Sequence, residues 1–495
     1  MAATGDVDEY LKESLILHSD HQDPSCDGHK DVQEGRYDII DGSNDNGHQA
    51  TKGSSTWMVL LSTLVAVCGS YQFGCCVGYS APTQADIRES LHLSLAEYSV
   101  FGSIVTIGAM IGAITSGGIA DWIGRKKAMA MSSVICILGW VALSVSKGAF
   151  LLDIGRFCTG YGIGVFSYVV PVFIAEITPK NLRGGLATVH QVLITSGISV
   201  TFIIGTLMPW RLLALTGIIP CVILLCGIGF IPESPRWLAK VGRHKQFEEA
   251  LWRLRGNDPD IYREAAEIQD YIETLNTLPK ARVQDLFQGR YTRSLIVGVG
   301  LMLFQQFSGI NGVLFYASET FVSAGFTSGK IGTVATGCIQ VPVTILGALL
   351  MDKSGRRVLL MASASGSCLG CLFTGVSLYF KAHGITQGWV PMLALLGILL
   401  YLGSFSLGLA AVPWVMMSEI FPINIKGIAG SFVTLITWFG SWALSFTFNF
   451  LMSWSPPGTF FLFGGFCALT VAFVAVIVPE TKGRTLEEIQ ADLNS

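Results

Sequence analysis

The stretch Asp121-Trp-Ile-Gly-Arg-Lys126 occurs a second time as Asp352-Lys-Ser-Gly-Arg-Arg357, and this repeat decides the fold. Each copy follows a long apolar run and ends in two basic residues. Two further pairs occur in the same order: Glu176-Ile-Thr-Pro179 matches Glu419-Ile-Phe-Pro422, and Pro232-Glu-Ser234 matches Pro479-Glu-Thr481. Three matches in one order, each at the end of an apolar run, predict a chain made of two duplicated halves.

The apolar runs around these motifs are long enough to cross a bilayer, which needs about 20 apolar residues in a helix. Six runs precede a hydrophilic block and six follow it. The expected spans are 57–82, 98–119, 128–148, 154–175, 186–208 and 211–231, then 294–318, 331–351, 358–380, 389–417, 428–453 and 459–478. Because no Asp, Glu, Lys or Arg lies between Gly427 and Pro479, Ser455-Pro-Pro-Gly458 is expected to join the last two helices.

The composition supports lipid as the main solvent of this chain. Of 495 residues, 51% are hydrophobic and 14% are charged, whereas soluble domains carry about 25% charge. An ordinary soluble enzyme, a coiled coil and a disordered scaffold are therefore excluded, and an isoelectric point near 6.2 argues against nucleic-acid binding. Eleven of the 12 cysteines, from Cys68 to Cys467, lie in or beside apolar runs, so we expect buried free thiols rather than disulfides or metal ligands.

Lysines and arginines predict the orientation, because cytoplasmic loops retain them. They follow the second, fourth, eighth and tenth spans and fill the central block, while the alternate loops are nearly bare. Both termini are therefore expected to be cytoplasmic. The expected division is a disordered tail at 1–55, a first bundle at 56–232, a linker at 233–292, a second bundle at 293–480 and a short tail at 481–495. Within the linker, 246–254 and 262–275 have the spacing of amphipathic helices.

These observations predict an all-α membrane protein with twelve transmembrane helices in two pseudosymmetric six-helix bundles, with short cytoplasmic helices between them. Two such halves around a midplane cavity form the architecture of carriers that open alternately to the two sides of a membrane. The sequence has no Gly-x4-Gly-Lys-Ser/Thr loop, which disfavours pumping driven by ATP.

Five motifs together resemble the sugar porter family of the major facilitator superfamily. They are the two Asp-x-x-Gly-Arg loops, Pro232-Glu-Ser-Pro-Arg236, Gln305-Gln-Phe-Ser-Gly-Ile-Asn311, Val412-Pro-Trp414 and Pro479-Glu-Thr-Lys-Gly483. The resemblance covers roughly residues 57–490. Together with the long N-terminal tail, the stretch Phe73–Gln84 is similar to the plant early-responsive-to-dehydration branch. The resemblance implies the major facilitator fold and transport of a monosaccharide, a hexose such as glucose being the expected substrate.

The charged motifs at the helix ends predict a conformational latch on the cytoplasmic face. Ion pairs there can hold one state of the carrier and break as the halves rock. The positive-inside rule alone explains the arginines but not the acids that accompany them. The expected latch residues are Asp121, Arg125, Glu176, Arg183, Glu233, Arg236, Asp352, Arg356, Arg357, Glu419, Lys426 and Glu480.

Side-chain amides inside the apolar runs are the candidate sugar ligands. A neutral polyol needs amide or hydroxyl partners and an aromatic surface in an otherwise apolar cavity, and an unpaired amide in lipid costs several kcal/mol. The alternative is that these amides form hydrogen bonds between helices. The resemblance to the sugar porter family favours sugar contact for the amides and implies that Trp414 lines the cavity. The expected binding residues are Gln191, Gln305, Gln306, Asn311, Gln340, Trp414 and Thr437.

Glycines in two spans predict local bending. Gly309, Gly312 and the 403–408 region with Pro413 allow helices 7 and 10 to bend as gates, or to pack closely against neighbours. Both readings remain open from the sequence.

The first span lacks the acid that proton-driven members of the family carry after Phe-Gly. That position is Cys76, the residue before Phe73 is Gln72, and no Asp, Glu, Lys or Arg lies between Trp57 and Ala85. His190 can titrate near neutral pH, but we favour a hydrogen-bonded packing role for it. Facilitated diffusion is therefore the preferred mode, with proton-coupled symport or antiport as the alternative and protons kept as a second ligand.

A sugar sensor and a membrane enzyme are the alternatives to a carrier. A non-transporting sugar sensor with a carrier fold commonly has a long signalling tail, and this chain ends soon after Thr485. A membrane enzyme is disfavoured because no cluster of His and Asp within a helix suggests a metal or nucleophile. We expect no enzyme activity, cofactor, metal or nucleic-acid partner, and a monomer embedded in the vacuolar membrane, with the plasma membrane as the alternative.

Overall fold

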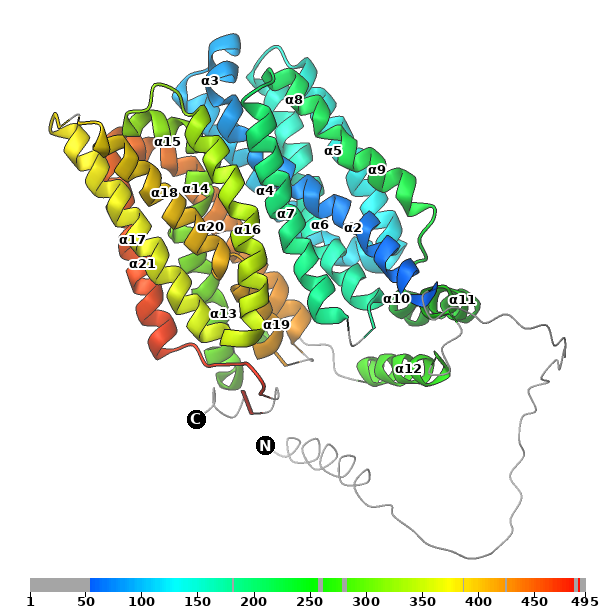
Figure 1. Ribbon diagram of the computed structural model, residues 1–495. Coiled ribbons are helices and arrows are strands. Elements are labelled where there is room, and N and C mark those ends of the chain that lie inside the picture. Colours follow the sequence, from blue (N-terminus) through cyan, green and yellow to red (C-terminus); the bar gives the residue numbers. More distant parts are fainter. Residues whose placement is uncertain are drawn as a thin grey trace, which may run out of the picture. The chain divides into compact units, whose positions relative to one another are not determined.

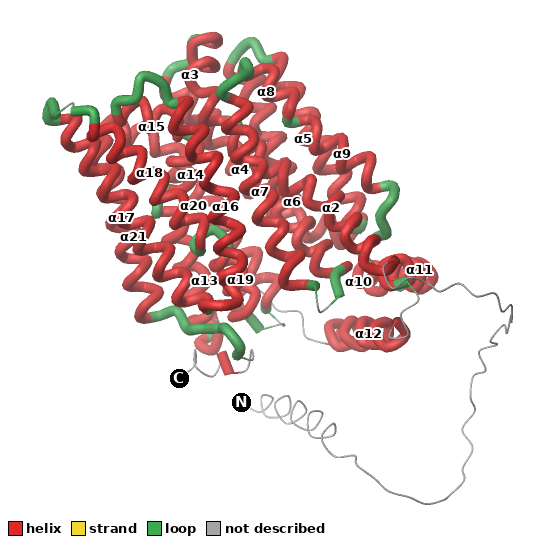
Figure 2. The backbone as a smooth tube through the Cα atoms, in the orientation of Figure 1, coloured by secondary structure: helices red, strands yellow, loops and turns green. Residues whose placement is uncertain are grey.

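The computed structural model describes residues 54–179, 182–256, 261–277, 283–385, 387–422, 425–484 and 488–489. Regular structure in these ranges is helical throughout, as Figure 2 shows. The predicted tail at 1–55 lies almost wholly outside them, so its expected disorder stays a prediction. Within these ranges, twelve helical spans are long and apolar enough to cross a membrane, which confirms the expected six and six and identifies an integral multi-pass membrane protein.

The first six spans use eight helices (Figure 1). They are α2 (Ser54–Gly78), α3 (Ser80–Leu91), α4 (Leu95–Ile123), α5 (Arg125–Val145), α6 (Ala149–Ile177), α7 (Arg183–Gly205), α8 (Trp210–Thr216) and α9 (Ile218–Ile228). The linker then forms α10 (Pro235–Lys240), α11 (His244–Arg255), α12 (Ile261–Thr277) and the 3-10 helix η1 (Val283–Phe287). The two amphipathic helices expected in the linker are thereby confirmed as α11 and α12.

The last six spans are divided into nine helices. They are α13 (Gly289–Phe307), α14 (Ile310–Phe315), α15 (Ala317–Ala324), α16 (Lys330–Ser354), α17 (Arg356–Ala382), α18 (Trp389–Leu407), α19 (Val412–Ile420), α20 (Lys426–Trp454) and α21 (Pro456–Val476). Helices α10–α12 lie at one end of the spans in Figure 1, which we call the linker end. Helices α3 and α15 lie at the opposite end, which we call the far end.

Several spans are broken rather than continuous. The first breaks at Tyr79, the seventh at Ser308–Gly309 and again at Tyr316, and the tenth between α18 and α19. Gly309 has φ of 98°, and a Cβ there would lie 2.4 Å from the Phe463 ring, so only glycine fits this break. The bends expected in helices 7 and 10 are confirmed; the break in the first span was not anticipated.

Close backbone contact holds α4 against α6. A Cβ at Gly112 would lie 2.2 Å from the Tyr161 carbonyl oxygen, and one at Gly160 would lie 2.2 Å from the Val105 carbonyl oxygen. Lipid supplies little hydrophobic drive between helices, so small residues that let backbones touch provide the packing energy. All eleven cysteines in the described ranges are free, as the sequence predicts, but only six of them are buried, and Cys226 and Cys338 are exposed.

Candidate functional site

Three predicted amides form one hydrogen-bonded chain where α13 meets α14. Asn311 Nδ2 donates to Gln306 Oε1 at 2.6 Å and to Ser441 Oγ of α20 at 2.8 Å. Gln306 Nε2 in turn donates to Gln305 Oε1 at 3.3 Å. Gln305 and Gln306 are buried. The structure therefore brings Gln305, Gln306 and Asn311 together inside the second half.

Gln305 also fixes the break in the tenth span. Its Nε2 donates to the Leu409 carbonyl oxygen at 2.6 Å, between α18 and α19. The Leu409 N–H donates to Ser363 Oγ at 2.9 Å, so both groups freed at the break are paired. Trp414 follows on α19 and remains 37% exposed. Part of the hydrogen-bonding capacity of Gln305 is thus structural, while the Trp414 ring keeps an accessible face.

A second polar face joins the two halves along α7 and α16. Thr344 Oγ1 donates to the backbone carbonyl oxygen of Gln340 at 2.8 Å and lies 3.3 Å from Thr195 Oγ1. Gln191 lies one turn before Thr195, whose hydroxyl donates to the Gln191 carbonyl at 3.1 Å. Gln340 is 3% exposed, and its Oε1 has no protein hydrogen-bond partner within the described ranges. This oxygen is an unpaired acceptor that is enclosed in this conformation.

Thr437 and its neighbour Trp438 lie on α20 near the amide chain. The buried Thr437 hydroxyl donates to the Val433 carbonyl at 2.8 Å, so only its acceptor capacity is left. Trp438 was missed by the sequence reasoning. Its Nε1 is buried without a partner among the described side chains, and its ring centroid lies 6.0 Å from that of Phe73 on α2. A tryptophan one position from a predicted site residue was the only available signal.

At the linker end of the first half, Arg125 binds Glu176 through two hydrogen bonds of 2.9 Å. Arg125 Nη1 also lies 3.0 Å from Asp121 Oδ1, and Lys240 Nζ of α10 lies 2.8 Å from Asp121 Oδ2. Lys240 was not predicted. The bidentate geometry positions the end of α6 against the α4–α5 turn.

The second half repeats this arrangement. Arg356 Nη2 lies 3.1 Å from Glu419 Oε1, and Thr481 Oγ1 donates to Glu419 Oε2 at 2.6 Å. Lys426 Nζ donates to the Ser418 carbonyl at 2.7 Å. In the linker, the Arg236 guanidinium lies 5.7 Å from the Tyr271 ring centroid. The side chains of Arg183 and Asp352 lie outside the described part of the structure.

Glu233 and Glu480 explain the repeated Pro-Glu-Ser/Thr motif. Glu233 accepts from the Lys126 N–H at 3.2 Å in the first turn of α5, and Glu480 accepts from the Arg356 and Arg357 N–H groups at 2.9 and 3.0 Å in α17. Each carboxylate therefore caps a helix N-terminus, where negative charge is favoured. The internal repeat in the sequence identifies the motif but not its role as a helix cap.

The glycine of each Asp-x-x-Gly-Arg loop makes room for the capping acid. Gly124 has φ of 94° and Gly355 has φ of 90°. A Cβ on Gly124 would lie 2.6 Å from Glu233 Oε2, and one on Gly355 would lie 2.7 Å from Glu480 Oε2. Glycine is thus required twice over, by backbone conformation and by the approach of a carboxylate.

The two capping acids differ in their pKa. Burial raises the pKa of Glu233, although the N–H groups of Ser234 and Lys126 donate to it. Burial would also raise the pKa of Glu480, but backbone N–H donors from Lys482, Arg356, Arg357 and Thr481 outweigh it and hold the pKa below its ordinary value. The two capping sites are therefore similar in geometry but differ in proton affinity.

Besides the Thr195–Thr344 contact, two polar contacts between the halves lie at the far end. Gln84 Nε2 of α3 donates to Glu319 Oε2 of α15, and Asn449 Nδ2 donates to Ser99 Oγ at 2.9 Å. The latch ion pairs found in the described ranges each join groups of the first half and its linker, or of the second half alone. Pairing of latch residues across the halves stays a prediction for another conformation.

Groups that bear on proton coupling are held by packing contacts. His190 Nδ1 lies 2.7 Å from Ser70 Oγ of α2, which confirms the packing role. Arg156 is fully buried and donates to the Cys76 carbonyl at 2.8 Å and to Ser80 Oγ at 2.5 Å. Among the described side chains no carboxylate lies within 4.0 Å of Arg156, so it supports the break in the first span rather than an ion pair.

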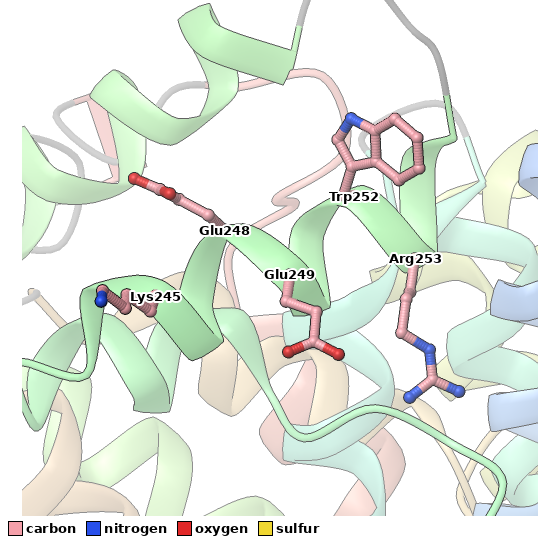
Figure 3. A pocket seen from close by; sticks show the side chains of 5 residues that line it. All are labelled: Lys245, Glu248, Glu249, Trp252 and Arg253. Carbon is pink, nitrogen blue, oxygen red and sulfur yellow. The ribbon is translucent and has the colours of Figure 1, made fainter. Parts of the chain in front are cut away.

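A surface hollow on α11 is separate from these groups. Figure 3 shows its lining side chains, Lys245, Glu248, Glu249, Trp252 and Arg253. All five belong to one linker helix and are exposed. The hollow lacks the amides and the two-sided enclosure that a sugar site needs.

Two six-span halves with interior amides and duplicated helix-end ion pairs define a secondary carrier of the major facilitator type. The profile of the family described as "Sugar (and other) transporter" matches residues 40–493, and the chain belongs to this family. It is 63% identical over 447 residues to "Sugar transporter ERD6-like 16" of Arabidopsis thaliana, covering 90% of this chain and 93% of that protein. It is 47% identical over 452 residues to "Sugar transporter ERD6" of the same plant, covering 91% and 90%.

Solved structures give the same fold. The proton:xylose symporter XylE bound to 6-bromo-6-deoxy-D-glucose superposes with a TM-score of 0.73 at 27% identity, covering 89% of this chain and 100% of that one. The inward open conformation of XylE from E. coli gives 0.74 at 26% identity, covering 88% and 99%. The predicted fold class and family are thus confirmed, whereas the sensor alternative gains no support from these relatives.

Proposed function

We propose that this protein moves a monosaccharide, a hexose such as glucose, across a membrane by alternating access between its two halves. The observation that carries the proposal is the set of polar groups buried inside membrane-spanning helices: the amide chain from Gln305 to Asn311 and the unpaired Gln340 oxygen. Unpaired polar groups in such surroundings are costly, and sugar hydroxyls can satisfy them. The similarity to named sugar transporters supports the same substrate class.

The proposed site lies between two pairs of contacting helices, α7 with α16 and α13 with α20. The sugar ligands proposed are Gln191, Gln305, Gln306, Asn311, Gln340, Trp414 and Thr437, to which the geometry adds Trp438. Hydroxyl groups would pair with the amides while an aromatic ring covers an apolar sugar face. Binding need differ only modestly between the two open states, because a ligand shifts a conformational equilibrium only by its difference in affinity.

Contacts at the two ends of the bundles would close the central site alternately to each side of the membrane. The far end is held by Gln84 with Glu319 and by Ser99 with Asn449. We propose that the latch residues close the linker end when the far end opens, with Arg125 and Arg356 exchanging some of their partners. Rigid halves rocking about a shared interface is a common form of this transition.

Facilitated diffusion is the mode that the interior favours. The first span has no Asp or Glu, and the two terminal nitrogens of Arg156 beside Cys76 donate to a carbonyl and a hydroxyl rather than to a carboxylate. Proton-coupled transport is the second candidate, supported by the similarity to a proton:xylose symporter. We further propose a monomer with both termini cytoplasmic, placed in the vacuolar membrane, which puts the linker end on the cytoplasmic side.

Reconstitution in liposomes tests both the substrate and the mode. Purified protein should carry labelled D-glucose, and not L-glucose, until inside and outside concentrations are equal, with or without a pH gradient. Accumulation above equal concentration when a gradient is imposed would establish the proton-coupled candidate. Failure to move any hexose or pentose faster than protein-free liposomes would refute the sugar assignment.

A further inference from the structure

The far-end contact between α3 and α15 contains an acid that sugar binding does not use. Gln84 Nε2 donates to Glu319 Oε2 and so joins the first half to the second. Gln84 is 2% exposed, whereas Glu319 is half-buried. The pair lies at the end opposite the linker helices, as the positions of α3 and α15 in Figure 1 show.

The other polar atom of Gln84 is left without a partner. Gln84 Oε1 is buried and accepts no hydrogen bond from any described protein group. A buried acceptor without a donor is costly. An ionised carboxylate cannot supply that donor, because it is an acceptor only, but a protonated carboxylic acid has one O–H group to donate. Amide and acid would then form two complementary hydrogen bonds in place of one.

No described neighbouring group of Glu319 supplies the missing donor to Gln84 Oε1. On α3, Arg88 lies one turn after Gln84, and its Nε is buried without a partner in the described structure, while Asp86 and Glu89 are exposed. No described basic side chain lies within 4.0 Å of the Glu319 carboxylate.

Other titratable groups near α15 belong to the elements packed on it and make their own contacts. Lys381 of α17 donates to the Ser323 carbonyl at 2.7 Å, and Tyr401 of α18 donates to the Ser308 carbonyl at 3.0 Å. Lys330 at the start of α16 is exposed. Tyr316, immediately before α15, donates to the Ser445 carbonyl at 3.2 Å. Tyr379 and His383 at the end of α17 contact each other at a 4.1 Å ring separation.

We propose that Glu319 and Gln84 form a proton-binding lock: a proton taken up from the far side by the Glu319 carboxylate donates to Gln84 Oε1 and holds the far end closed. The inference rests on the proposed carrier function. The Tyr316 ring, immediately before α15, stacks 5.3 Å from Phe448 and packs on Gly102 of the other half. Because the pair lies at the far end, its proton comes from that side in this proposal, and the lock regulates opening without carrying protons across the membrane.

Equilibrium exchange of labelled hexose in proteoliposomes, with the same pH inside and outside, measures the effect without any gradient. One added hydrogen bond should slow far-end opening, and hence exchange, about two- to ten-fold as the pH falls from about 7.5 to about 4.5. Glu319→Gln should exchange slowly at every pH, because its amide donates the second hydrogen bond permanently. Gln84→Leu should exchange fast at every pH.

Two control variants separate the lock from a general effect. Asn449→Ala removes the other far-end hydrogen bond and should change the rate while keeping the pH dependence. Glu89→Gln removes an exposed acid on α3 and should behave as wild type. The lock is refuted if Glu319→Gln keeps the pH dependence of the wild-type protein, or if the wild-type rate does not change with pH.

A measurement that needs no sugar keeps the lock testable if transport of hexose is not found. Thermal unfolding of the purified full-length protein in detergent should show wild type less stable than Glu319→Gln near neutral pH and equal to it at acidic pH. An equal difference at both pH values would overturn the lock. Absence of hexose exchange with this pH-dependent difference intact would overturn the carrier proposal alone.

Discussion

Replacing Gln340 by Leu should raise the stability of the sugar-free protein and weaken sugar binding at the same time. Gln340 is 3% exposed and its Oε1 lacks a protein partner in the described ranges. Leaving such an acceptor unpaired costs about 1–3 kcal/mol, and leucine of similar size removes that cost. If a sugar hydroxyl donates to this oxygen, the variant loses about 1–1.5 kcal/mol of binding, which is about a five- to ten-fold increase in Kd.

The two effects are measured on one preparation. Thermal unfolding in detergent without sugar gives the stability change, and equilibrium binding of labelled hexose gives Kd. Ser367→Ala is the matched control, because the Ser367 hydroxyl on α17 is also buried without a partner but lies outside the proposed site. It should stabilise the protein and leave Kd unchanged. Unchanged hexose affinity in Gln340→Leu would show that this oxygen does not contact the sugar.

Four further substitutions test neighbouring parts of the structure. Trp438→Phe keeps a ring but removes its unpaired Nε1 donor, so hexose Kd should rise about two- to ten-fold, and an unchanged Kd would count against this residue. Gly112→Ala should destabilise the protein by about 1–3 kcal/mol, because its Cβ would lie 2.2 Å from a backbone oxygen. The control Gly118→Ala on the same helix meets nothing within 4 Å and should stabilise the protein by about 0.5–1 kcal/mol. Thermal unfolding that ranks the two variants the other way would contradict the α4–α6 packing. The lowered pKa of Glu480 contributes stability above the unfolded pKa of about 4.3 that is lost as the pH falls through the folded value, so Glu480→Gln should lower Tm more at neutral than at acidic pH. The raised pKa of Glu233 has the opposite effect on stability, which is lost as the pH rises through the folded pKa, so Glu233→Gln should be tolerated best at neutral pH. For either glutamate, equal Tm changes at neutral and acidic pH would refute the direction given for its pKa.

The fold was predictable because its signals are local in the sequence. Span length, charge between spans and three repeated motifs each act within a few turns of helix, and the structure has the expected spans. The break at Gly309 was also predictable, because a glycine within a span permits the positive φ, 98°, that this residue has. The break at Tyr79 was not, because the Arg156 side chain that supports it comes from another helix far along the chain.

The candidate site was predictable in residue type but not in its hydrogen bonding. Amides inside apolar runs pointed to Gln305, Gln306 and Asn311, and these three do form one network. Which polar atoms remain unpaired depends on contacts between distant helices, so neither Gln340 Oε1 nor Trp438 Nε1 could be singled out from sequence. The pairing of acidic and basic residues within one half, rather than across the two, likewise required the packed structure.

The most direct test of the central claim is a structure of the full-length protein with a bound hexose. The account predicts density for the sugar between α7, α13, α16 and α20, with a hydroxyl within hydrogen-bonding distance of Gln340 Oε1 and another polar atom within reach of Trp438 Nε1. A sugar bound elsewhere, or these two atoms still without partners in the complex, would contradict it.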